Sequence, residues 1–332
     1  MSASTVRSAV TMVATMRLPV CLPRLKTMER GPMKRLAIVG VDITHKFIYP
    51  GFINGFDAMK MERDGEWMAE VFRGAANLAL DPQVRVTAIA CPDRDVADRI
   101  AGATGIEVVV ESVDQLPSDL DGVLVMERKG WRHMELARPF LERGKYVYFD
   151  KPVVETLSQW RSIVDLANRT GSRVFGGSAL RYSPKMAAAL TDLGERPPVS
   201  VVVTGPGPWY EYACHHVELL QMIYGSAIEG AAGVGGDGQG AAAIRWQAGG
   251  FGTVQWGPYR GEFRIDAYDQ AGNGHRFYII DDFRQYYQGL SQAIVDGVLS
   301  RIQPDHQAIA AIVGVLDQVG SALTKYAEGR WR

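Results

Sequence analysis

The stretch Leu36-Ala37-Ile38-Val39-Gly40 is a short apolar run that ends in glycine, which is typical of a buried strand in a parallel sheet. Similar runs follow it and alternate with helical patterns as far as about residue 175. The expected strands are 84–90, 107–110, 122–125, 146–149 and 173–175, and the expected helices are 95–103, 133–143 and 156–170. Strands that alternate with helices predict an α/β domain with a doubly wound parallel sheet.

A different rhythm begins after about residue 197. Strand patterns follow one another there, with turns between them and no helical crossovers. The expected strands are 199–203, 241–246, 251–256, 262–268 and 276–280, with helices at 211–223, 286–299 and 308–326. This order predicts an α+β domain with a mainly antiparallel sheet. The segment 230–240 is rich in glycine, so we expect a mobile loop there.

The composition is that of an ordinary soluble globular protein. Of the 332 residues, 47% are hydrophobic and 22% are charged, and a chain of this length is expected to form two domains. A net charge of −1 gives no electrostatic reason to expect nucleic acid or an anionic membrane as a partner, and no stretch approaches the roughly 20 apolar residues that span a bilayer. The cysteines are widely spaced and form neither a disulfide framework nor a Cys-x-x-Cys site, which favours a reducing, cytoplasmic location.

Residues 1–33 differ from the rest of the chain. They contain several basic residues, many small or hydroxyl residues and no acid before Glu29. This composition is similar to that of a targeting peptide, but Arg17 and Pro19 interrupt its apolar stretch. We expect 1–33 to be a disordered extension or the product of a start codon assigned too far upstream. The two domains are then expected at 34–152 and 153–332.

Lys151 follows a buried strand and is followed by proline, in the sequence Val147-Tyr148-Phe149-Asp150-Lys151-Pro152. Open α/β sheets place their chemistry beyond the carboxyl ends of such strands. Pro152 restricts the backbone of Lys151 to an extended conformation, and apolar surroundings would make the ammonium easier to deprotonate. The alternative is a solvated lysine at a strand end.

A second group of polar residues lies in the expected helix 211–223. Glu211, His215 and Glu218 fall at i, i+4 and i+7, which places them on one helix face. An imidazole between two carboxylates is a candidate proton-transfer group. Alternatively, His215 is a satisfied core histidine, His216 a surface one, and the carboxylates favour the helix dipole.

The turn after the first strand departs from the G-x-G-x-x-G pattern that binds dinucleotides. It reads Gly40-Val41-Asp42-Ile43-Thr44-His45, so the first glycine alone is present. Asp42 replaces the glycine that lets the backbone approach the pyrophosphate, and His45 replaces the one that allows close helix packing. Taken alone, this turn predicts no cofactor.

The second strand ends at Cys91, far beyond the usual spacing from Gly40, so material is inserted between them. The insertion includes 49–55 and 59–62 and is either a lid or a surface elaboration. After the strand, Asp93 could hold the adenosine ribose and Arg94 a 2′-phosphate, and the sequence does not separate NAD from NADP.

Three motifs in the same order resemble those of the glucose–fructose oxidoreductase/inositol dehydrogenase (Gfo/Idh/MocA) family, over about residues 34–330. The segment 144–152 is similar to the family's G-K-h-V-…-E-K-P, with Asp150 in place of glutamate. The segment 178–184 is similar to R-[FY]-x-P, and 211–218 to D-x-G-x-H-x-x-D with each acid lengthened.

This resemblance implies a Rossmann domain followed by an α+β domain whose open sheet forms oligomers, here a homodimer or homotetramer. It implies hydride transfer between NAD or NADP and a sugar, polyol or related hydroxy compound, with Lys151 and His215 as the catalytic pair and Glu211 at the associated acid position. The implied cofactor contacts are Gly40, Val41, Asp42, Thr44, His45, Cys91, Asp93, Arg94, Glu127, Lys151 and Pro152. The implied substrate contacts are Arg181, Tyr182 and His216.

Two other functions stay open at this point. Asp42 and His45 suit a non-catalytic family member that binds or regulates and has lost the cofactor. A metal-dependent lyase or isomerase would instead use Glu211, His215 and Glu218 as ligands.

Overall fold

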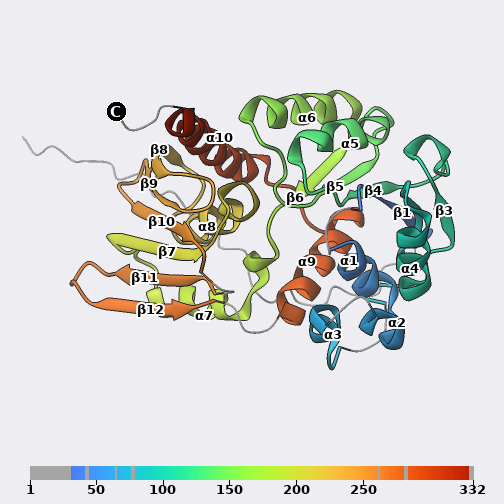
Figure 1. Cartoon of the computed structure of the whole chain (residues 1–332), viewed down its shortest axis with the longest axis horizontal. Coiled ribbons are helices and arrows are strands. Elements are labelled where there is room, and N and C mark those ends of the chain that lie inside the picture. The colour runs from blue at the N-terminus through green and yellow to red at the C-terminus, as the bar shows by residue number, and fades with distance from the viewer. Residues whose placement is uncertain are drawn as a thin grey trace, which may run out of the picture.

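The computed structural model describes residues 31–41, 45–63, 66–75, 79–259, 262–279 and 283–328. Two sheets with their helices make up these residues and lie side by side, sheet A on the right of Figure 1 and sheet B on the left. Nearly all of the expected extension 1–33 lies outside the described residues. No helix of the described part is long and apolar enough to cross a membrane.

Sheet A is a parallel sheet at the centre of the first half of the chain. Its strands are β1 (Lys34–Val39), β2 (Val84–Ala90), β3 (Val108–Val110), β4 (Gly122–Val125), β5 (Tyr146–Phe149) and β6 (Arg173–Gly176). They lie in the order β3-β2-β1-β4-β5-β6, and every neighbouring pair is parallel. This is the strand order of a dinucleotide-binding Rossmann fold, with its switch point between β1 and β4. The predicted doubly wound sheet is confirmed.

Helices cover both faces of sheet A. They are α1 (His45–Asn54), α2 (Ala58–Glu62), α3 (Glu66–Phe72), α4 (Arg94–Thr104), α5 (His133–Leu141) and α6 (Leu157–Thr170), with short 3₁₀ turns η1 (Val113–Gln115) and η2 (Gly130–Arg132). Local sequence fixes the ends of several. Thr156 begins α6 through a capping box with Gln159, and Gly171 ends it in the left-handed conformation.

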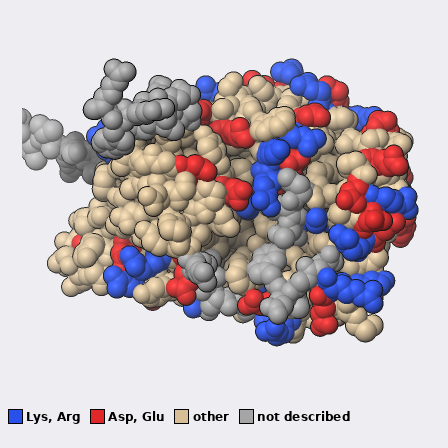
Figure 2. Space-filling view, in the orientation of Figure 1, with Lys and Arg blue, Asp and Glu red and all other residues tan. Residues whose placement is uncertain are grey.

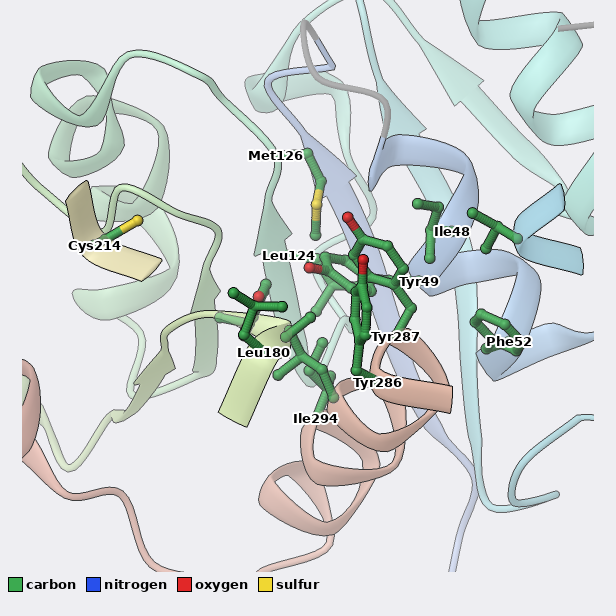
Figure 3. Packing of buried hydrophobic residues seen from close by; sticks show 14 of the residues in the cluster. Ile48, Tyr49, Phe52, Leu124, Met126, Leu180, Cys214, Tyr286, Tyr287 and Ile294 are labelled. Atoms are coloured by element: carbon green, nitrogen blue, oxygen red, sulfur yellow. The ribbon is translucent and has the colours of Figure 1, made fainter. Parts of the chain in front are cut away.

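The insertion between β1 and β2 is part of the core, which corrects the expectation of a lid or a surface elaboration. It forms α1, α2 and α3, and the side chains of Ile48, Phe52 and Met61 are buried in the same cluster as Ile38 of β1. Figure 3 shows Ile48 and Phe52 within this packing, near the tyrosines of α9 (Phe283–Val298). The crossover from β1 to β2 therefore consists of three short helices.

Sheet B forms the second half of the fold. Its strands are β7 (Ser200–Pro206), β8 (Ile228–Gly235), β9 (Gly240–Trp246), β10 (Phe251–Gly257), β11 (Arg264–Tyr268) and β12 (Gly274–Tyr278). Their order is β12-β11-β7-β10-β9-β8, in which β7 and β10 are parallel and the other neighbours antiparallel. The predicted mainly antiparallel sheet is confirmed. The loop expected at 230–240 is wrong in its first half, because 228–235 pair with β9.

The two halves are joined by more than one crossing of the chain. Strand β6 belongs to sheet A, so that sheet continues past the boundary expected at residue 152. Helix α9 packs against α1, and α10 (His306–Glu328) packs against both α6 and β8. The remaining elements are η3 (Ala179–Tyr182), α7 (Pro184–Leu193) and α8 (Trp209–Tyr224). The C-terminal helices α9 and α10 therefore pack against elements of the Rossmann half, and α10 also packs against sheet B.

Helix α2 offers a matched pair of methionines to test whether the insertion is core. Met61 is 0% exposed and Met59 is 75% exposed. We expect Met61→Ala to lower the free energy of unfolding by about 2–5 kcal/mol, because it leaves a cavity, and Met59→Ala to change it by less than about 0.5 kcal/mol. Urea unfolding followed by circular dichroism measures both. Equal effects of the two substitutions would contradict the assignment of the insertion to the core.

Candidate active site

A cavity of about 610 Å³ lies where the carboxyl edge of sheet A meets α8 and α9. The Rossmann half contributes residues that follow β4 and β5, and the other half contributes α8, η3 and the ends of β7 and β10. The described residues that line the cavity are His45, Arg128, Lys151, Pro152, Ala179, Leu180, Pro206, Gly207, Glu211, Tyr212, His215, Tyr259, Phe263, Phe283, Tyr286 and Tyr287. Predicted catalytic residues from both halves therefore face one space.

Lys151 reaches this cavity from the end of β5. The strand before it is buried, and Phe149 and Asp150 have no exposed surface. The Lys151 Nζ atom lies 5.5 Å from the centre of the Tyr212 ring, a cation–π contact between the two halves. The ammonium is thus held against an aromatic wall, as the sequence predicts for an aimed lysine.

His215 enters the cavity from α8, one residue after the buried Cys214. Its Nδ1 atom lies 2.5 Å from Ser178 Oγ, and its ring meets the Phe263 ring edge to face. Burial lowers the pKa of His215 well below its ordinary 6.5, and the positive charge of Lys151 lowers it further. The imidazole is therefore neutral at physiological pH. When Nδ1–H donates to Ser178, the lone pair on Nε2 remains available to accept a proton.

Glu211 lines the cavity one helical turn before His215. Its Oε1 atom lies 3.5 Å from Arg128 Nη1, and both side chains are partly exposed. The contact joins the segment after β4 to α8 across the cavity. A pair exposed to this degree contributes little to stability.

Glu218, the third acid of the helix face, has a structural role. Its buried carboxylate accepts hydrogen bonds from the Ser178 backbone N–H at 2.8 Å and from Arg181 Nε at 2.7 Å. These contacts anchor α8 to the segment that carries Ser178. Because Glu218 and Glu211 serve different partners, the ligand set proposed for a metal-dependent lyase is not gathered. The described residues contain no group of three or more His, Cys, Asp or Glu placed to hold a metal ion.

The three residues expected at the substrate lie outside the lining of the cavity. Arg181 pairs with Glu218 and donates to Gln221. The Tyr182 side chain packs against Gly289 of α9. The His216 ring is buried against Phe263, with Nδ1 bonded to the Tyr212 carbonyl, and burial lowers its pKa to about 4. His216 is the neighbour of His215 in the sequence, but consecutive residues of a helix point to different sides. Of the two, only His215 therefore faces the cavity.

Gly40 directly follows β1, at the start of the turn. Gly40 has a φ of +69°, and a Cβ atom there would lie 2.8 Å from Glu127 Cβ, so no other residue fits. Val41 follows Gly40, and α1 begins at His45. Asp42 and Thr44, both expected at the cofactor, lie outside the described residues.

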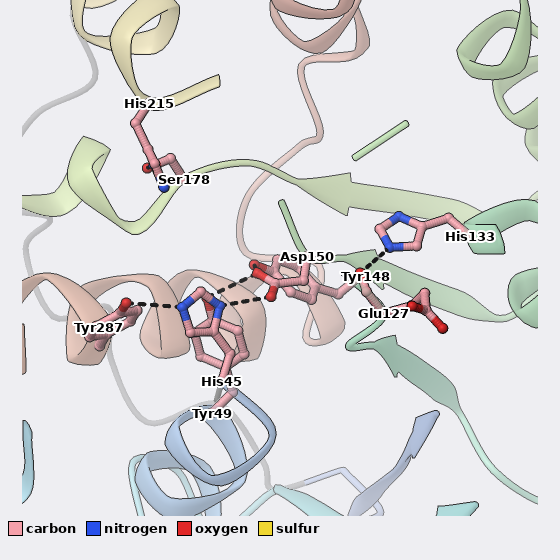
Figure 4. Close-up of polar contacts among 9 residues, drawn as sticks. All are labelled: His45, Tyr49, Glu127, His133, Tyr148, Asp150, Ser178, His215 and Tyr287. Atoms are coloured by element: carbon pink, nitrogen blue, oxygen red, sulfur yellow. Dashed lines mark hydrogen bonds and ion pairs between the residues drawn. The ribbon is translucent and has the colours of Figure 1, made fainter. Parts of the chain in front are cut away.

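His45 does not simply occupy the place of a glycine, because its ring is bonded to residues of two other elements. Its Nδ1 atom lies 2.7 Å from Asp150 Oδ2, and its Nε2 atom lies 2.9 Å from the Tyr287 hydroxyl. Figure 4 shows His45 between these two partners. Tyr49 and Tyr148 also donate to Asp150 Oδ1, at 3.3 and 3.4 Å.

Asp150 stays ionised in this enclosed setting. Burial raises its pKa, but His45 and the Lys151 ammonium lower it by more, so the pKa of Asp150 lies below its ordinary 3.8.

Sequence reasoning did not identify Ser178 and Tyr287 as site residues. Ser178 lies in a quoted motif, whereas Tyr287 lies in a segment whose only signal was helical.

The residues expected to contact the adenosine end of the cofactor form hydrogen bonds with residues near them in the sequence. Asp93 caps α4 by accepting from the Val96 N–H at 3.0 Å. Arg94 pairs with Asp98 on the surface of the same helix. Cys91 follows β2 and donates its thiol hydrogen to the Asp93 carbonyl. None of the three presents a group that is aimed at a ribose.

Glu127 and His133 support the segment after β4. The buried Glu127 carboxylate pairs with Arg132 Nη1 at 2.8 Å and accepts from the Lys129 N–H. The two ring nitrogens of His133 lie 2.6 and 2.7 Å from the carbonyls of Val153 and Glu127. His133 thereby ties the segment after β4 to the one after Lys151, and the Glu127 charge is neutralised.

Comparison with known proteins agrees with this fold. The GFO_IDH_MocA model, described as an oxidoreductase family with an NAD-binding Rossmann fold, matches residues 66–178. This match covers about a third of the chain, so it shows a likeness of the Rossmann segment to that family. The inositol 2-dehydrogenase of Rhizobium meliloti (strain 1021) is 23% identical over 158 residues, which are 42% of this chain and 48% of that protein. The chain thus matches about half the length of this relative.

Solved structures with the same fold extend over most of the chain. GenD2 from gentamicin A biosynthesis, in complex with NAD, has a TM-score of 0.69 at 16% identity and covers 92% of this chain and 97% of its own. Scyllo-inositol dehydrogenase from Lactobacillus casei, with bound NAD(H) and scyllo-inositol, has a TM-score of 0.67 at 13% identity, with coverages of 88% and 97%. At these identities the likeness shows the fold of both halves.

Replacement of Asp150 should weaken the whole protein. We expect Asp150→Asn to lower the free energy of unfolding at neutral pH by about 3–5 kcal/mol, because it removes a buried carboxylate that is hydrogen-bonded to His45, Tyr49 and Tyr148. Asp98→Asn, which breaks the exposed pair with Arg94, should cost less than about 1 kcal/mol. Because its pKa is lowered in the folded state, the Asp150 carboxylate stabilises the wild type above pH 3.8, and this contribution should disappear as the pH falls below that value. Denaturant unfolding of the three proteins between neutral and acidic pH measures these effects.

Proposed function

We propose that this protein is an NAD(P)-dependent oxidoreductase that transfers hydride between the nicotinamide ring and a carbon bearing a hydroxyl group, in a polyol, sugar or related compound. One observation carries the proposal: Lys151 and the neutral His215 face the same cavity beyond the carboxyl edge of sheet A. That edge, at the switch point of the sheet, is where Rossmann folds bind dinucleotides. The likeness to that family and the NAD(H) found in two structural neighbours support it.

The residues around the cavity suit a bound dinucleotide. Gly40 lies close to Glu127, and the Glu127 carboxylate is neutralised by Arg132. Gly40, Val41 and the start of α1 would hold the pyrophosphate, and Lys151 and Pro152 would lie beside the nicotinamide. When bound, the cofactor supplies the hydride acceptor or donor.

His215 and Lys151 divide the proton chemistry between them. As hydride leaves the carbinol carbon, the hydroxyl proton passes to Nε2 of His215 while Nδ1–H stays bonded to Ser178. Lys151 donates a hydrogen bond to the same oxygen and stabilises the negative charge that develops on it. Glu211 and its partner Arg128 stand beside this pair and orient the substrate's other polar groups.

The assembly proposed with this function is a cytoplasmic homodimer or homotetramer formed through sheet B. Its strands carry exposed apolar side chains at Val234, Phe251, Tyr268 and Tyr278. Figure 2 shows few charged side chains over the sheet B half compared with the Rossmann half. Light scattering coupled to gel filtration tests this assembly, and a monomer at micromolar concentration would contradict it.

Two lysines flank β5 and provide a matched test of catalysis. Lys151 follows the strand at the cavity, and Lys145 precedes it at the opposite edge of the sheet. We expect Lys151→Met and His215→Gln to lower turnover by about 10²–10⁴-fold while Lys145→Met leaves it within about twofold. The assay follows NADH or NADPH absorbance with inositols, sugars and sugar acids. Full activity of both cavity variants would contradict the roles assigned to Lys151 and His215. Absence of hydride transfer by the wild type would favour a non-catalytic binding protein.

The pH dependence of oxidation should follow His215. The base must be neutral to accept a proton, and its lowered pKa keeps it neutral well below pH 6.5. We therefore expect kcat/KM to stay level from neutral pH to below 6.5 and to fall only in more acidic solution. Activity assays after brief incubation at each pH, with reassay at neutral pH to exclude unfolding, measure this profile. An acid limb centred at or above pH 6.5 would contradict the enclosed, neutral imidazole.

A further inference from the structure

Lys46 is the one lysine or arginine in the stretch 40–54, which contains the turn after β1 and the whole of α1. It is the second residue of α1, and its half-buried side chain folds back toward the turn. The Lys46 Nζ atom donates a hydrogen bond of 3.1 Å to the carbonyl of Val41, the residue after Gly40. The ammonium is thus fixed beside the turn that a dinucleotide phosphate would approach.

The neighbouring strand confirms where this charge lies. The positive charge of Lys46 lowers the pKa of the Cys91 thiol, an effect outweighed by burial, and Cys91 directly follows β2. Strands β1 and β2 are parallel neighbours, and Val39 pairs with Ala90 at their carboxyl ends. The Lys46 ammonium is bonded to the carbonyl of Val41, so it lies at the carboxyl end of β1, beside β2. A Rossmann fold places the adenosine diphosphate half of the cofactor on this side.

His45 and Lys46 point to opposite sides of the turn. His45 is turned toward Asp150 at the end of β5 and toward Tyr287 of α9, and both ring nitrogens are occupied there. The imidazole therefore lies on the side of the switch point where the nicotinamide is expected. Among the described residues of the turn and α1, the cationic group on the adenosine side is the Lys46 ammonium.

The negative charges expected near this turn explain why a lysine would be needed there. A pyrophosphate brings two negative charges, and the sequence adds a third at Asp42, where the dinucleotide fingerprint has glycine. Backbone N–H groups and a helix dipole alone bind phosphate in an intact glycine-rich loop. Here the ammonium at the start of α1 supplies a positive charge in the same stretch of sequence as the added carboxylate.

We propose that Lys46 is a cofactor-binding residue of this protein and that its ammonium contacts the pyrophosphate of the dinucleotide. This inference rests on the proposed function, because it takes the cofactor to be NAD(H) or NADP(H). It assigns the phosphate contact to a side chain, in a turn whose second and third glycines are absent.

The test is a fluorescence titration of the full chain with NADH and NADPH, together with calorimetric titration of ADP-ribose, which keeps the pyrophosphate and lacks nicotinamide. Lys46→Met keeps the length of the side chain and removes its charge. We expect this substitution to raise the dissociation constants of all three ligands about tenfold or more, because a charged hydrogen bond is lost. It should also reduce the salt dependence of binding. Lys60→Met is the matched control, since Lys60 also donates to a carbonyl, that of Gly102, but away from the turn.

Each outcome decides the proposal. Equal weakening of NADH, NADPH and ADP-ribose, with normal binding by Lys60→Met, supports the pyrophosphate contact. Weaker binding of NADPH alone would indicate that the ammonium contacts the 2′-phosphate and would overturn the assignment. Unchanged binding by Lys46→Met overturns the inference and leaves the proposed function standing. A wild-type protein that binds none of the three ligands overturns both. Thermal unfolding without ligand verifies that each variant is folded.

Discussion

The contact between the Asp150 carboxylate and His45 is the constraint on which the site depends. Asp150 has no exposed surface, so its charge is stable only where hydrogen bonds replace water. His45 provides the main one, and two tyrosines supply weaker ones. Because His45 begins α1 and Tyr287 belongs to α9, satisfying one carboxylate fixes the ends of β5, α1 and α9 relative to one another.

That constraint reaches the chemistry through the next residue in the chain. Lys151 follows Asp150, so a fixed Asp150 sets the direction from which the ammonium enters the cavity. On the opposite wall, Glu218 holds Ser178, and Ser178 in turn holds His215. Each catalytic candidate is therefore oriented by a neighbour whose own hydrogen bonds are satisfied inside the protein, as a preorganised site requires.

Periodicity and end signals were enough to predict sheet A, because its strands are short apolar runs separated by capped helices. Strand β8 was missed because its glycines and alanines lack the β-branched pattern of a strand, and pairing with β9 decides its conformation. The pairing of His45 with Tyr287, 242 positions apart, depends on how α9 returns to the Rossmann half. No local pattern encodes such a return, whereas Lys151 and His215 were found through motifs that are local.

Two departures from the family's pattern turn out to be one structural feature. The motif that ends β5 has aspartate where the resemblance leads one to expect glutamate, and the turn after β1 has His45 where it leads one to expect glycine. The imidazole requires space and a partner, and a carboxylate shortened by one methylene leaves space and is that partner. A glycine at 45 would leave the buried Asp150 without its strongest hydrogen bond, and a glutamate at 150 would crowd the ring. The unusual turn is thus matched by the unusual strand end, and it gives no reason by itself to infer a lost active site.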